Sequence, residues 1–423
     1  MRVCLYDDRG VANLEPLTLT RPAFELLCGQ TSLGVKQSRY FASCDLGILV
    51  RPQFSELYRL QQPSIAVNDL TWLRADTTIL VNSRWLPPAD AGPELNTPCV
   101  AMIGDEVAYV VVGPNLLTYC SPNTLEDCIE TWKNTLPHQR AGGRLVGYLW
   151  ELVQCNAEQI CIDFKCLSQQ HPWQGSIAVV GPPDQLWAHP AAQLDPMVMA
   201  DTTGGPVVIE HDAVVTAFSR LEGPCYIGPH THILGAKIRA GTTIGPNCRI
   251  GGEVEASLFQ GLSNKYHDGF VGHSYIGEWV NIGAGTQTSD LRNDYADVVM
   301  SVGGRQVATG LTKVGCVIGD HSKTGLGTLL NTGTNVGIFC NLLPAGRLLP
   351  KDIPSFSSWW NGCLREHSDL PRLLPTAAEV MRRRGFALTE VHAALYRLLC
   401  DQTAADRHRL IGEATPRPLR RSA

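Results

Sequence analysis

An aliphatic residue recurs every six positions along much of the second half of the chain. The positions are Ile227, Ile238, Ile244, Ile250, Ile276, Ile282, Ile318, Leu330 and Val336, and a small residue usually follows each four positions later. This period is typical of a left-handed parallel β-helix, in which each hexapeptide forms one face of a triangular prism and three complete a coil. The sequence therefore predicts a β-helix over residues 206–350.

The period is interrupted twice, around Glu255–Gly269 and around Ser289–Thr312. Insertions in such repeats project from the surface and often form a binding face, so we expect two loops there. The first carries a basic, aromatic and histidine cluster, Lys265-Tyr266-His267, and the second is rich in charged residues. The stretch Ser263–Tyr295 is therefore the first place to look for chemistry.

The first half of the chain alternates short apolar runs with helical patterns. The apolar runs lie at 3–6, 45–50, 78–81, 107–112 and 176–180, and helical patterns at 23–27, 123–131 and 147–152. Strands that alternate with helices predict a Rossmann-like α/β domain with a mostly parallel sheet, which we place at residues 1–194. Residues 355–410 are expected to hold two helices, Thr376–Gly385 and Leu388–Leu399, and residues 411–423 a disordered tail.

Composition excludes several classes of protein. A net charge of −5 and a pI near 6.2 provide no basic face for nucleic acid or anionic membranes. No apolar run approaches the length of a membrane span, and acids stand where a signal peptide needs apolar residues, so we expect a cytoplasmic protein. The 15 cysteines include no CxxC pair, which favours buried, reduced thiols over disulfides or a zinc site.

Two segments carry a resemblance to a known family. The opening Asp7–Leu26 contains DDRGVANLEPLTLTRP, and the second half contains NKYHDGFVG followed by NIGAGT. These resemble the bifunctional bacterial N-acetylglucosamine-1-phosphate uridyltransferase/glucosamine-1-phosphate acetyltransferases, and most closely a divergent, GlmU-like branch of sugar nucleotidyltransferases. The resemblance covers most of the chain. It implies a nucleotidyltransferase-like domain followed by an acyltransferase-like β-helix, with nucleoside triphosphate, sugar 1-phosphate and acetyl-CoA as substrates, and Mg²⁺ as cofactor.

The resemblance also implies roles for residues of the β-helix. His267 matches the base that takes a proton from the amino sugar, and its ordinary pKa near 6.5 suits that task. Asn281 matches a sugar-binding asparagine, and a structural amide ladder is the alternative reading. Arg239 matches an arginine that holds the sugar phosphate, a task for which its planar fork is suited. Weaker candidates for phosphates of the sugar or CoA are Lys265, Arg292 and Lys323, for which a solvated charge is the alternative.

Three positions depart from the family pattern. Glu255 stands where a second phosphate-binding lysine is expected, Phe270 replaces a tyrosine, and Asp290 replaces an asparagine. A carboxylate beside a phosphate is unfavourable unless a cation takes over its charge. The acceptor of the β-helix site therefore differs from glucosamine 1-phosphate, or acetyl transfer is absent.

The first domain lacks the Gly-rich loop of ordinary nucleotidyltransferases. Arg9, Arg21 and Lys36 are the candidates for binding the triphosphate there, with ordinary surface charges as the alternative. For Mg²⁺, Asn82 follows the strand at 78–81 where relatives carry an aspartate, and Asp7 or Asp8 would have to add the negative charge. Metal ligands and the nucleotide base stay open at this point.

Three functions remain. The first is a sugar-1-phosphate nucleotidyltransferase that forms UDP-N-acetylglucosamine or a similar nucleotide sugar, with an acetylating β-helix. The second is a nucleotidyltransferase whose β-helix is only a trimerising, regulatory platform. The third is a non-enzymatic assembly or sensing protein. His267 favours the first, whereas Glu255 and Phe270 favour the second. In each case the resemblance implies a homotrimer of parallel β-helices.

Overall fold

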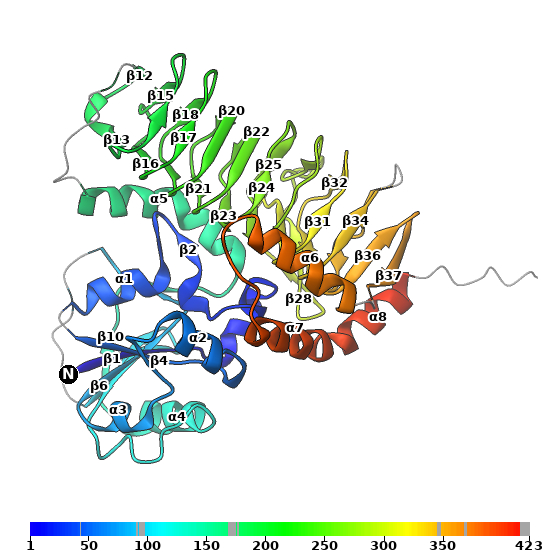
Figure 1. Cartoon of the computed structure of the whole chain (residues 1–423). Helices are drawn as coiled ribbons and strands as arrows, with labels where there is room; N and C mark the ends of the chain where they lie inside the picture. Colours follow the sequence, from blue (N-terminus) through cyan, green and yellow to red (C-terminus); the bar gives the residue numbers. More distant parts are fainter. Residues whose placement is uncertain are drawn as a thin grey trace, which may run out of the picture. The chain divides into compact units, whose positions relative to one another are not determined.

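The computed structural model describes residues 1–42, 44–89, 92, 98–167, 175, 177–344, 348–367 and 370–414. The chain forms two compact units, which are coloured from blue to cyan and from green to red in Figure 1. The first contains residues 1–14 and 18–151, and the second contains residues 15–17 and 152–423. Each unit is described by itself below.

The first unit is built on a seven-stranded sheet in the order β10-β8-β9-β6-β1-β4-β5. Its strands are β1 (Arg2–Tyr6), β4 (Asp45–Leu49), β5 (Ala66–Val67), β6 (Thr78–Asn82), β8 (Cys99–Ile103), β9 (Glu106–Val112) and β10 (His138–Arg140). Strand β1 runs parallel to β4 and β6, while β9 is antiparallel to β6 and β8. The predicted mostly parallel α/β domain is confirmed.

Helices and short strands complete the first unit. The helices are α1 (Leu33–Tyr40), α2 (Ser55–Gln61), α3 (Leu70–Arg74) and α4 (Leu125–Thr135), with 3₁₀ turns at Arg9–Leu14, Leu17–Leu19, Ala23–Glu25 and Pro52–Phe54. The short strands are β2 (Leu27–Cys28), β3 (Thr31–Ser32), β7 (Trp85–Leu86) and β11 (Arg144–Leu145). Ile129 and Trp132 of α4 pack against Tyr6 and Leu80 of the sheet, in a core that excludes water from this face.

The second unit is a parallel β-helix with three ladders of strands. Ladder A contains β13 (Leu186–Ala188), β16 (Val207–Ile209), β19 (Cys225–Ile227), β21 (Thr242–Ile244), β23 (Leu258–Gly261), β26 (Tyr275–Glu278), β30 (Cys316–Ile318), β33 (Thr334–Val336) and β35 (Asp352–Ile353). Ladder B contains β12 (Ala178–Val180), β15 (Met199–Asp201), β18 (Arg220–Glu222), the second halves of β20 (His232–Ile238) and β22 (Arg249–Glu255), β25 (Phe270–Gly272), β27 (Gln287–Thr288) and β32 (Leu329–Leu330).

Ladder C takes the first halves of β20 and β22, because these two strands bend around a corner of the prism. Its other strands are β14 (Gln193–Leu194), β17 (Val214–Val215), β24 (Asn264–Lys265), β31 (Lys323–Thr324), β34 (Asn341–Leu343), β36 (Ser357–Trp360) and β37 (Cys363–Glu366). Asn281 bridges β24 and β31 as a single residue. The predicted β-helix is confirmed.

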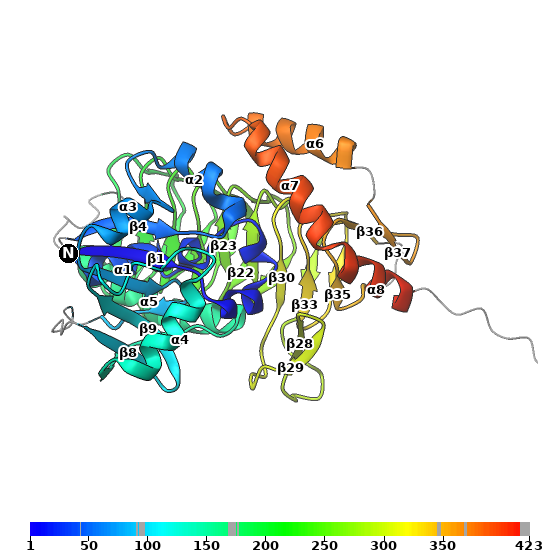
Figure 2. The same ribbon diagram turned by 90° about the horizontal axis from the view of Figure 1, so that it is seen from below.

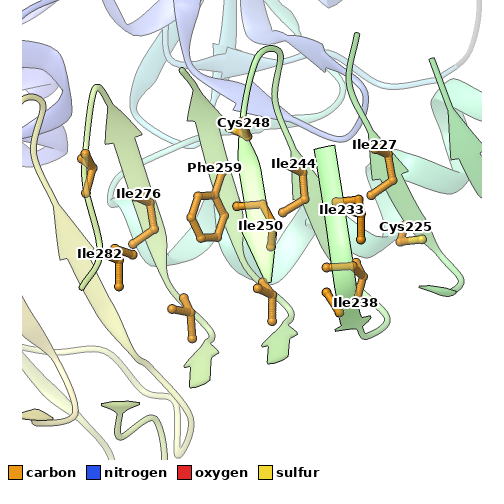
Figure 3. Packing of buried hydrophobic residues seen from close by; sticks show 14 of the residues in the cluster. Cys225, Ile227, Ile233, Ile238, Ile244, Cys248, Ile250, Phe259, Ile276 and Ile282 are labelled. Carbon is orange, nitrogen blue, oxygen red and sulfur yellow. The ribbon is translucent and has the colours of Figure 1, made fainter. Parts of the chain in front are cut away.

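The aliphatic residues of the repeat fill the interior of the prism. Ile227, Ile244 and Ile276 of ladder A are fully buried together with Ile238 and Ile250, and Figure 3 shows them stacked from coil to coil. Stacking is possible because in-register parallel strands lie about 4.8 Å apart, which brings equivalent side chains into contact. The hydrophobic residues of the repeat therefore form one continuous core.

The prediction of an interruption around Glu255–Gly269 is wrong. Leu258 pairs with Thr243 and Tyr275, and Lys265 pairs with Ile250, so this stretch is a regular coil of the β-helix. The period is hidden because Phe259 and Lys265 occupy interior positions that elsewhere hold isoleucine. Only the turn between β24 and β25, residues 266–269, bulges from the coil.

The second interruption is confirmed as an excursion. It contains an antiparallel hairpin of β28 (Val299–Val302) and β29 (Arg305–Ala308). Figure 2 shows this hairpin beside β33 and β35 of ladder A, where Ser301 Oγ donates to Asp352 Oδ2 at 2.6 Å. The insertion at Ser289–Thr312 therefore adds a small surface element without disturbing the stacking of the coils on either side.

The boundary expected at residue 194 lies too late in the chain. Strand β12 pairs with β15 and strand β13 pairs with β16, so the β-helix already begins at Ala178 rather than at 206. The helix α5 (Leu149–Leu167) also belongs mainly to the second unit, where Ile160 and Phe164 pack against Trp187, Val208 and Tyr226. The first coils escaped the repeat pattern because they use valine, alanine and leucine in place of isoleucine.

One corner of the prism, between ladders A and C, has a left-handed backbone in eight successive coils; we call it the left-handed corner. Its residues are Asp212, His230, Asn247, Leu262, Trp279, His321, Phe339 and Phe356, with φ between 55° and 60°. Most of them donate a backbone N–H to the residue that precedes the equivalent position of the coil below; for example, His321 donates to Glu278. The corner therefore holds the same conformation in every coil, whatever the side chain.

Three helices follow the β-helix: α6 (Leu370–Arg382), α7 (Glu390–Gln402) and α8 (Ala404–Ala414). Two were expected; the third, α8, extends past residue 410, and residues 415–423 of the expected tail lie outside the described residues. Side chains of α7 cover the upper part of the left-handed corner: the Tyr396 ring lies 5.3 Å from His321 and 4.9 Å from Phe339.

Two further expectations can be compared with the structure. All fifteen cysteines are free, in agreement with the prediction of reduced thiols. Among the described residues, no helix is long and apolar enough to cross a membrane.

Candidate functional site

The first candidate site lies where β1, β4 and β6 end at the same edge of the sheet of the first unit. Ligands of open α/β sheets bind outside the carboxyl ends of parallel strands, so this edge is the expected place. Asp7, which follows β1, is buried and accepts hydrogen bonds from Ser83 Oγ (2.6 Å) and the backbone N–H of Ala23 (3.1 Å). Burial raises the pKa of Asp7, and the Arg51 guanidinium 3.2 Å away opposes this shift.

Asp8 and Arg84 form a second ion pair at this edge. Arg84 is buried, and its Nε and terminal nitrogen donate to the two Asp8 oxygens at 2.7 and 2.5 Å. Burial acts to lower the pKa of Arg84, but Asp8 and Glu106 outweigh that effect and keep the guanidinium charged. A Cβ at Gly10 would overlap this guanidinium, so the glycine lets the chain cross closely over Arg84.

The donors expected to bind Mg²⁺ do not fit that role as they are arranged. Asn82 Nδ2 donates to Asp8 Oδ2 at 2.8 Å, and Asn82 Oδ1 accepts the backbone N–H of Arg84. Every carboxylate oxygen of Asp7 and Asp8 accepts at least one hydrogen bond within the protein. Mg²⁺ needs oxygen ligands in near-octahedral positions, and here these oxygens hold cationic and amide groups instead.

The three cations expected to bind phosphate lie in different environments. Arg9 is exposed at the start of a 3₁₀ turn, and its backbone N–H donates to Glu126. Arg21 and Lys36 are buried, with 6% and 7% of their surface exposed. Arg51 and Arg84 were missed by the sequence analysis, although Arg84 lies only two residues after the strand that drew attention to Asn82. Arg9 is the exposed cation of this group, whereas Arg51 and Arg84 are paired with the two aspartates of the edge.

The second candidate site is the turn between β24 and β25, which carries His267. The His267 side chain is exposed, and its ring lies 5.1 Å from that of Tyr266. Among the described residues, its ring nitrogens have no hydrogen-bond partner. A Cβ at Gly251 would lie 2.2 Å from the Tyr266 carbonyl oxygen, so only glycine in the coil below allows the turn to sit there. The histidine is thus presented to solvent by a closely packed turn.

Lys265 supports this turn from inside the prism. Only 1% of its surface is exposed, and its Nζ donates to the carbonyls of Gly251 (2.7 Å) and His267 (3.1 Å). Burial lowers the pKa of Lys265 to about 8. The prediction that Lys265 binds substrate phosphate is therefore not supported: its amine is committed to two backbone carbonyls and holds the His267 turn in place.

The NIGAGT segment stacks directly on the His267 turn. Gly285 donates its N–H to the Asp268 carbonyl at 2.8 Å, and Phe270 donates to Thr286 at 3.1 Å. A Cβ at Gly285 would meet only the Gly327 backbone, and a Cβ at Gly327 would meet nothing within 4 Å. The glycines of the coils above therefore leave open space next to Asp268, the residue that follows His267.

Asn281 and Lys323 are brought together on ladder C. Asn281 is exposed and points outward, forming β-bridges to Asn264 and Lys323. Asn264 accepts a hydrogen bond from Arg384, and burial lowers the pKa of Lys323. Asn264 and Asn281 therefore occupy equivalent positions on neighbouring coils, which is the placement that an amide ladder would need.

Arg239 and Arg292 lie apart from both the His267 turn and the pair formed by Asn281 and Lys323. Arg239 lies on ladder B and contacts carboxylates of Glu222, Glu253 and Glu255, with 3.1 Å to Glu255. Arg292 pairs with Asp294 at 2.5 Å on the exposed insertion. A phosphate bound to Arg239 would have to replace or approach these acids, which makes phosphate binding there unfavourable.

A histidine–carboxylate pair was missed by the sequence analysis. His273 Nδ1 lies 2.6 Å from Asp290 Oδ2, and both are largely buried, with 20% and 13% of the side chain exposed. Burial acts to raise the pKa of Asp290, but His273 and Lys313 outweigh this and hold it below its usual range. Asp290 was noted as a departure from the family; His273, at the far end of β25 from His267, offered no motif. The pair shows that the acid at 290 has a partner.

Comparison with known proteins shows which part of the chain resembles known families. Residues 3–171 match the family model described as sugar nucleotidyl transferase. The match covers less than half of the chain. A "Bifunctional sugar-1-phosphate nucleotidylyltransferase/acetyltransferase" of Sulfurisphaera tokodaii is 34% identical over 161 residues, which are 35% of this chain and 38% of the relative. The expected resemblance to divergent GlmU-like proteins is confirmed.

Other relatives share names but only part of their length. A "Bifunctional protein GlmU" of Gloeothece citriformis is 33% identical over 148 residues, covering 34% of this chain and 27% of the relative. The chain thus matches between about a quarter and two fifths of these GlmU-like proteins. Among solved structures, GDP-perosamine N-acetyl transferase from Caulobacter crescentus covers 75% of this chain and 93% of its own, at 12% identity and a TM-score of 0.12, a value that carries no argument.

Proposed function

We propose that this protein is a sugar-1-phosphate nucleotidyltransferase that also transfers an acetyl group on its β-helix. The match of residues 3–171 to the sugar nucleotidyl transferase model carries the first activity. The names of the relatives, which combine nucleotidyltransferase and acetyltransferase, support the pairing of the two. We further propose UDP-N-acetylglucosamine, or a nucleotide sugar close to it, as the product.

In nucleotidyl transfer the protein contributes mainly positioning and electrostatic stabilisation and little covalent chemistry. An oxygen of the sugar 1-phosphate attacks the α-phosphorus of the nucleoside triphosphate, a new P–O bond forms, and pyrophosphate leaves. Cationic side chains that hold the phosphates in line lower the barrier. Arg9 is exposed and free to turn toward a triphosphate, whereas Arg84 and Arg51 fix the two aspartates of the edge. Mg²⁺, if required, would arrive with the nucleotide rather than on Asp7, Asp8 and Asn82.

Acetyl transfer would use His267 as the base. The amine of an amino-sugar phosphate attacks the thioester carbon of acetyl-CoA, the C–S bond breaks, and the CoA thiolate leaves with a proton from the amine that passes through His267. The exposed imidazole and the open space beside Gly285 and Gly327 support this assignment. Because Arg239 is paired with three acids, the sugar phosphate would be held by other cations, for which Lys323 beside Asn281 on ladder C is the candidate.

The assay uses the full chain with Mg²⁺, a panel of nucleoside triphosphates, and glucosamine, N-acetylglucosamine and glucose 1-phosphates. Pyrophosphate release and CoA release are measured in parallel. Arg9→Ala tests the first site and Arg140→Ala, an exposed arginine of β10, is its matched control. His267→Ala tests the second site and His138→Ala, another exposed histidine, is its control.

We expect pyrophosphate release that falls about tenfold or more in Arg9→Ala, and CoA release that is lost in His267→Ala, with both controls at wild-type rates. Pyrophosphate release without CoA release would leave the nucleotidyltransferase and reduce the β-helix to a platform. Neither product across the whole panel would overturn the proposal. The assembly as a homotrimer and the cytoplasmic location stay predictions.

A further inference from the structure

Two consecutive coils of the β-helix place nitrogen and oxygen ligands at the lower end of the left-handed corner, which is the end formed by the first coils in the chain. His211 and Asp212 come from the turn after β16, and His230 comes from the equivalent turn after β19. Both turns lie on the surface: about half of the Asp212 and His230 side chains is exposed, 54% and 51%. None of these residues belongs to either candidate site described above.

The three side chains converge on one point. Asp212 Oδ2 lies 3.1 Å from His211 Nδ1 and 3.7 Å from His230 Nδ1, and the ligand atoms of all three lie within 4.8 Å of one another. The two imidazole rings are perpendicular, with centroids 5.0 Å apart. Zinc in a tetrahedral site has metal–ligand bonds of about 2.0–2.2 Å, which puts neighbouring ligand atoms roughly 3.3 Å apart. The two spacings to Asp212 Oδ2 are close to that value.

The backbone holds this arrangement in place. Asp212 and His230 both have left-handed backbones, with φ of 55° and 57°, and His230 donates its N–H to the His211 carbonyl at 3.1 Å. Strand pairing of the two coils therefore fixes the spacing of the ligands, so that little order has to be gained when an ion binds. A third imidazole, His189 of the coil below, lies 5.7 Å from the His211 ring.

We propose that His211, Asp212 and His230 bind a divalent transition metal ion of the zinc class. Two imidazoles and a carboxylate are a ligand set that such ions prefer over Mg²⁺ or Ca²⁺, which favour all-oxygen sites. The set leaves at least one coordination position to water or to His189. The site is independent of the proposed function, and nothing in the acetyl or nucleotidyl transfer requires it.

The charge of the site agrees with this assignment. A hydrogen bond from His211 and the charges of His230 and His189 hold the pKa of Asp212 below its usual range, so that the carboxylate is ionised at neutral pH. Metal binding needs neutral imidazoles and an ionised carboxylate, so it competes with protons at the two histidines.

The test titrates the full-length protein, purified without a histidine tag, with Co²⁺ and reads the visible absorption, then adds Zn²⁺ as competitor. Co²⁺ in a tetrahedral nitrogen and oxygen site absorbs in the visible region, whereas thiolate ligands add sulfur-to-metal charge-transfer bands. This distinction matters because Cys166 and Cys363 are exposed. The protein is therefore also titrated in a Cys166→Ser/Cys363→Ser background.

The ligand variants are His211→Asn, Asp212→Asn and His230→Asn. Asparagine tolerates a left-handed backbone and already occupies this corner at Asn247, so the fold is retained. His408→Ala, an exposed histidine of α8, is the matched control. Circular dichroism and the thermal midpoint without metal verify that each variant is folded.

We expect one Co²⁺ per chain, bound without thiolate bands and displaced by Zn²⁺, with affinity reduced about tenfold or more in each ligand variant. The His408→Ala protein should bind like the wild type. The proposal is overturned if micromolar Co²⁺ leaves the spectrum unchanged, if the bands disappear in the double cysteine background, or if folded His230→Asn binds as tightly as the wild type.

Discussion

The two ends of the left-handed corner have the same backbone conformation but carry different side chains. At the lower end, His211, Asp212 and His230 are exposed, and their rings meet edge to face. At the upper end, His321, Phe339 and Phe356 stack face to face with centroids 4.5 and 5.1 Å apart. The β-helix backbone therefore repeats the same position in each coil. The side chain at that position determines whether it is exposed to solvent, can bind a ligand or is covered by a helix.

The covering helix explains why the upper end is apolar. Tyr396 of α7 packs on the rings of His321 and Phe339, and its hydroxyl lies 3.1 Å from His321 Nε2. Phe386, just before α7, contacts Trp279 with ring centroids 5.5 Å apart. Aromatic pairs of this geometry contribute about 0.5–1.5 kcal/mol beyond the burial of their area. The stack thus serves to attach the C-terminal helices to the β-helix.

The largest effect is expected from removing one ring of the stack. Phe339 is 3% exposed and contacts His321, Phe356 and Tyr396. Phe339→Ala therefore leaves a cavity lined by these three side chains. Phe→Ala changes in cores cost about 3–5 kcal/mol. Urea unfolding, read by tryptophan fluorescence and circular dichroism, measures the loss. A loss below about 1 kcal/mol would show that the stack does not attach the helices.

A smaller effect is expected from removing only the hydroxyl of Tyr396. Tyr396→Phe keeps the ring contacts and deletes the hydrogen bond to His321, which is buried. Such a bond contributes about 0.5–1.5 kcal/mol. The same urea experiment compares this variant with Phe339→Ala. Equal losses in the two proteins would mean that the hydrogen bond, rather than packing, holds α7.

The two ends should also lose stability at different pH values as the solution is acidified. Burial lowers the pKa of His392 in α7, which favours the neutral form of this histidine in the folded state. Its contribution to stability is present above the unfolded pKa near 6.5 and is lost as the pH falls through its lower folded pKa. The lowered pKa of Asp212 places its own loss below the ordinary aspartate range.

Hydrogen exchange at a series of pH values, corrected for intrinsic rates, measures this difference. Between about pH 6.5 and 5, amides of α7 should lose protection before amides of the coils around Asp212. His392→Gln, which cannot take up a proton, should remove the acid-dependent change in α7. Simultaneous loss of protection at both ends would contradict the assignment.

The smallest effect is expected at the exposed end. His230→Asn removes an exposed ring while keeping a residue that accepts the left-handed backbone. Surface substitutions of this kind change the free energy of unfolding by no more than about 0.5 kcal/mol. Urea unfolding in the presence of a chelator tests this. A larger loss without metal would mean that His230 is part of the packing after all.

Much of the β-helix could be predicted from the sequence because its interior repeats the same environment every six residues. Ile244, Ile250 and Ile276 are all fully buried, as the period requires. The prediction failed where other residues fill the same interior positions. Phe259 and Lys265 hid one coil, and Leu186 and Ala200 hid the coils at its start. The spatial repeat is more regular than the sequence repeat, since backbone pairing tolerates several side chains at one position.

The candidate sites were less predictable. The exposure of His267 and its place beside NIGAGT agree with the motif, whereas the burial of Lys265 does not. A motif fixes residue types, but the direction of a side chain depends on the register of the strand that carries it. The partners of Asp8 and Asp7 come from Arg84, 76 residues away, and Arg51, 44 residues away, which no local pattern indicates.

The sequence by itself determined the fold class, the β-helix and the resemblance to GlmU-like proteins, because the hydrophobic period and the opening motif are local properties of the chain. Only the tertiary structure decided which charged groups are free for chemistry. Asp7 and Asp8 are bound to arginines, Arg239 is bound to acids, and His211, Asp212 and His230 converge across coils. The physical reason is that charge interactions depend on distance in space and on burial, which folding sets between residues far apart in the chain.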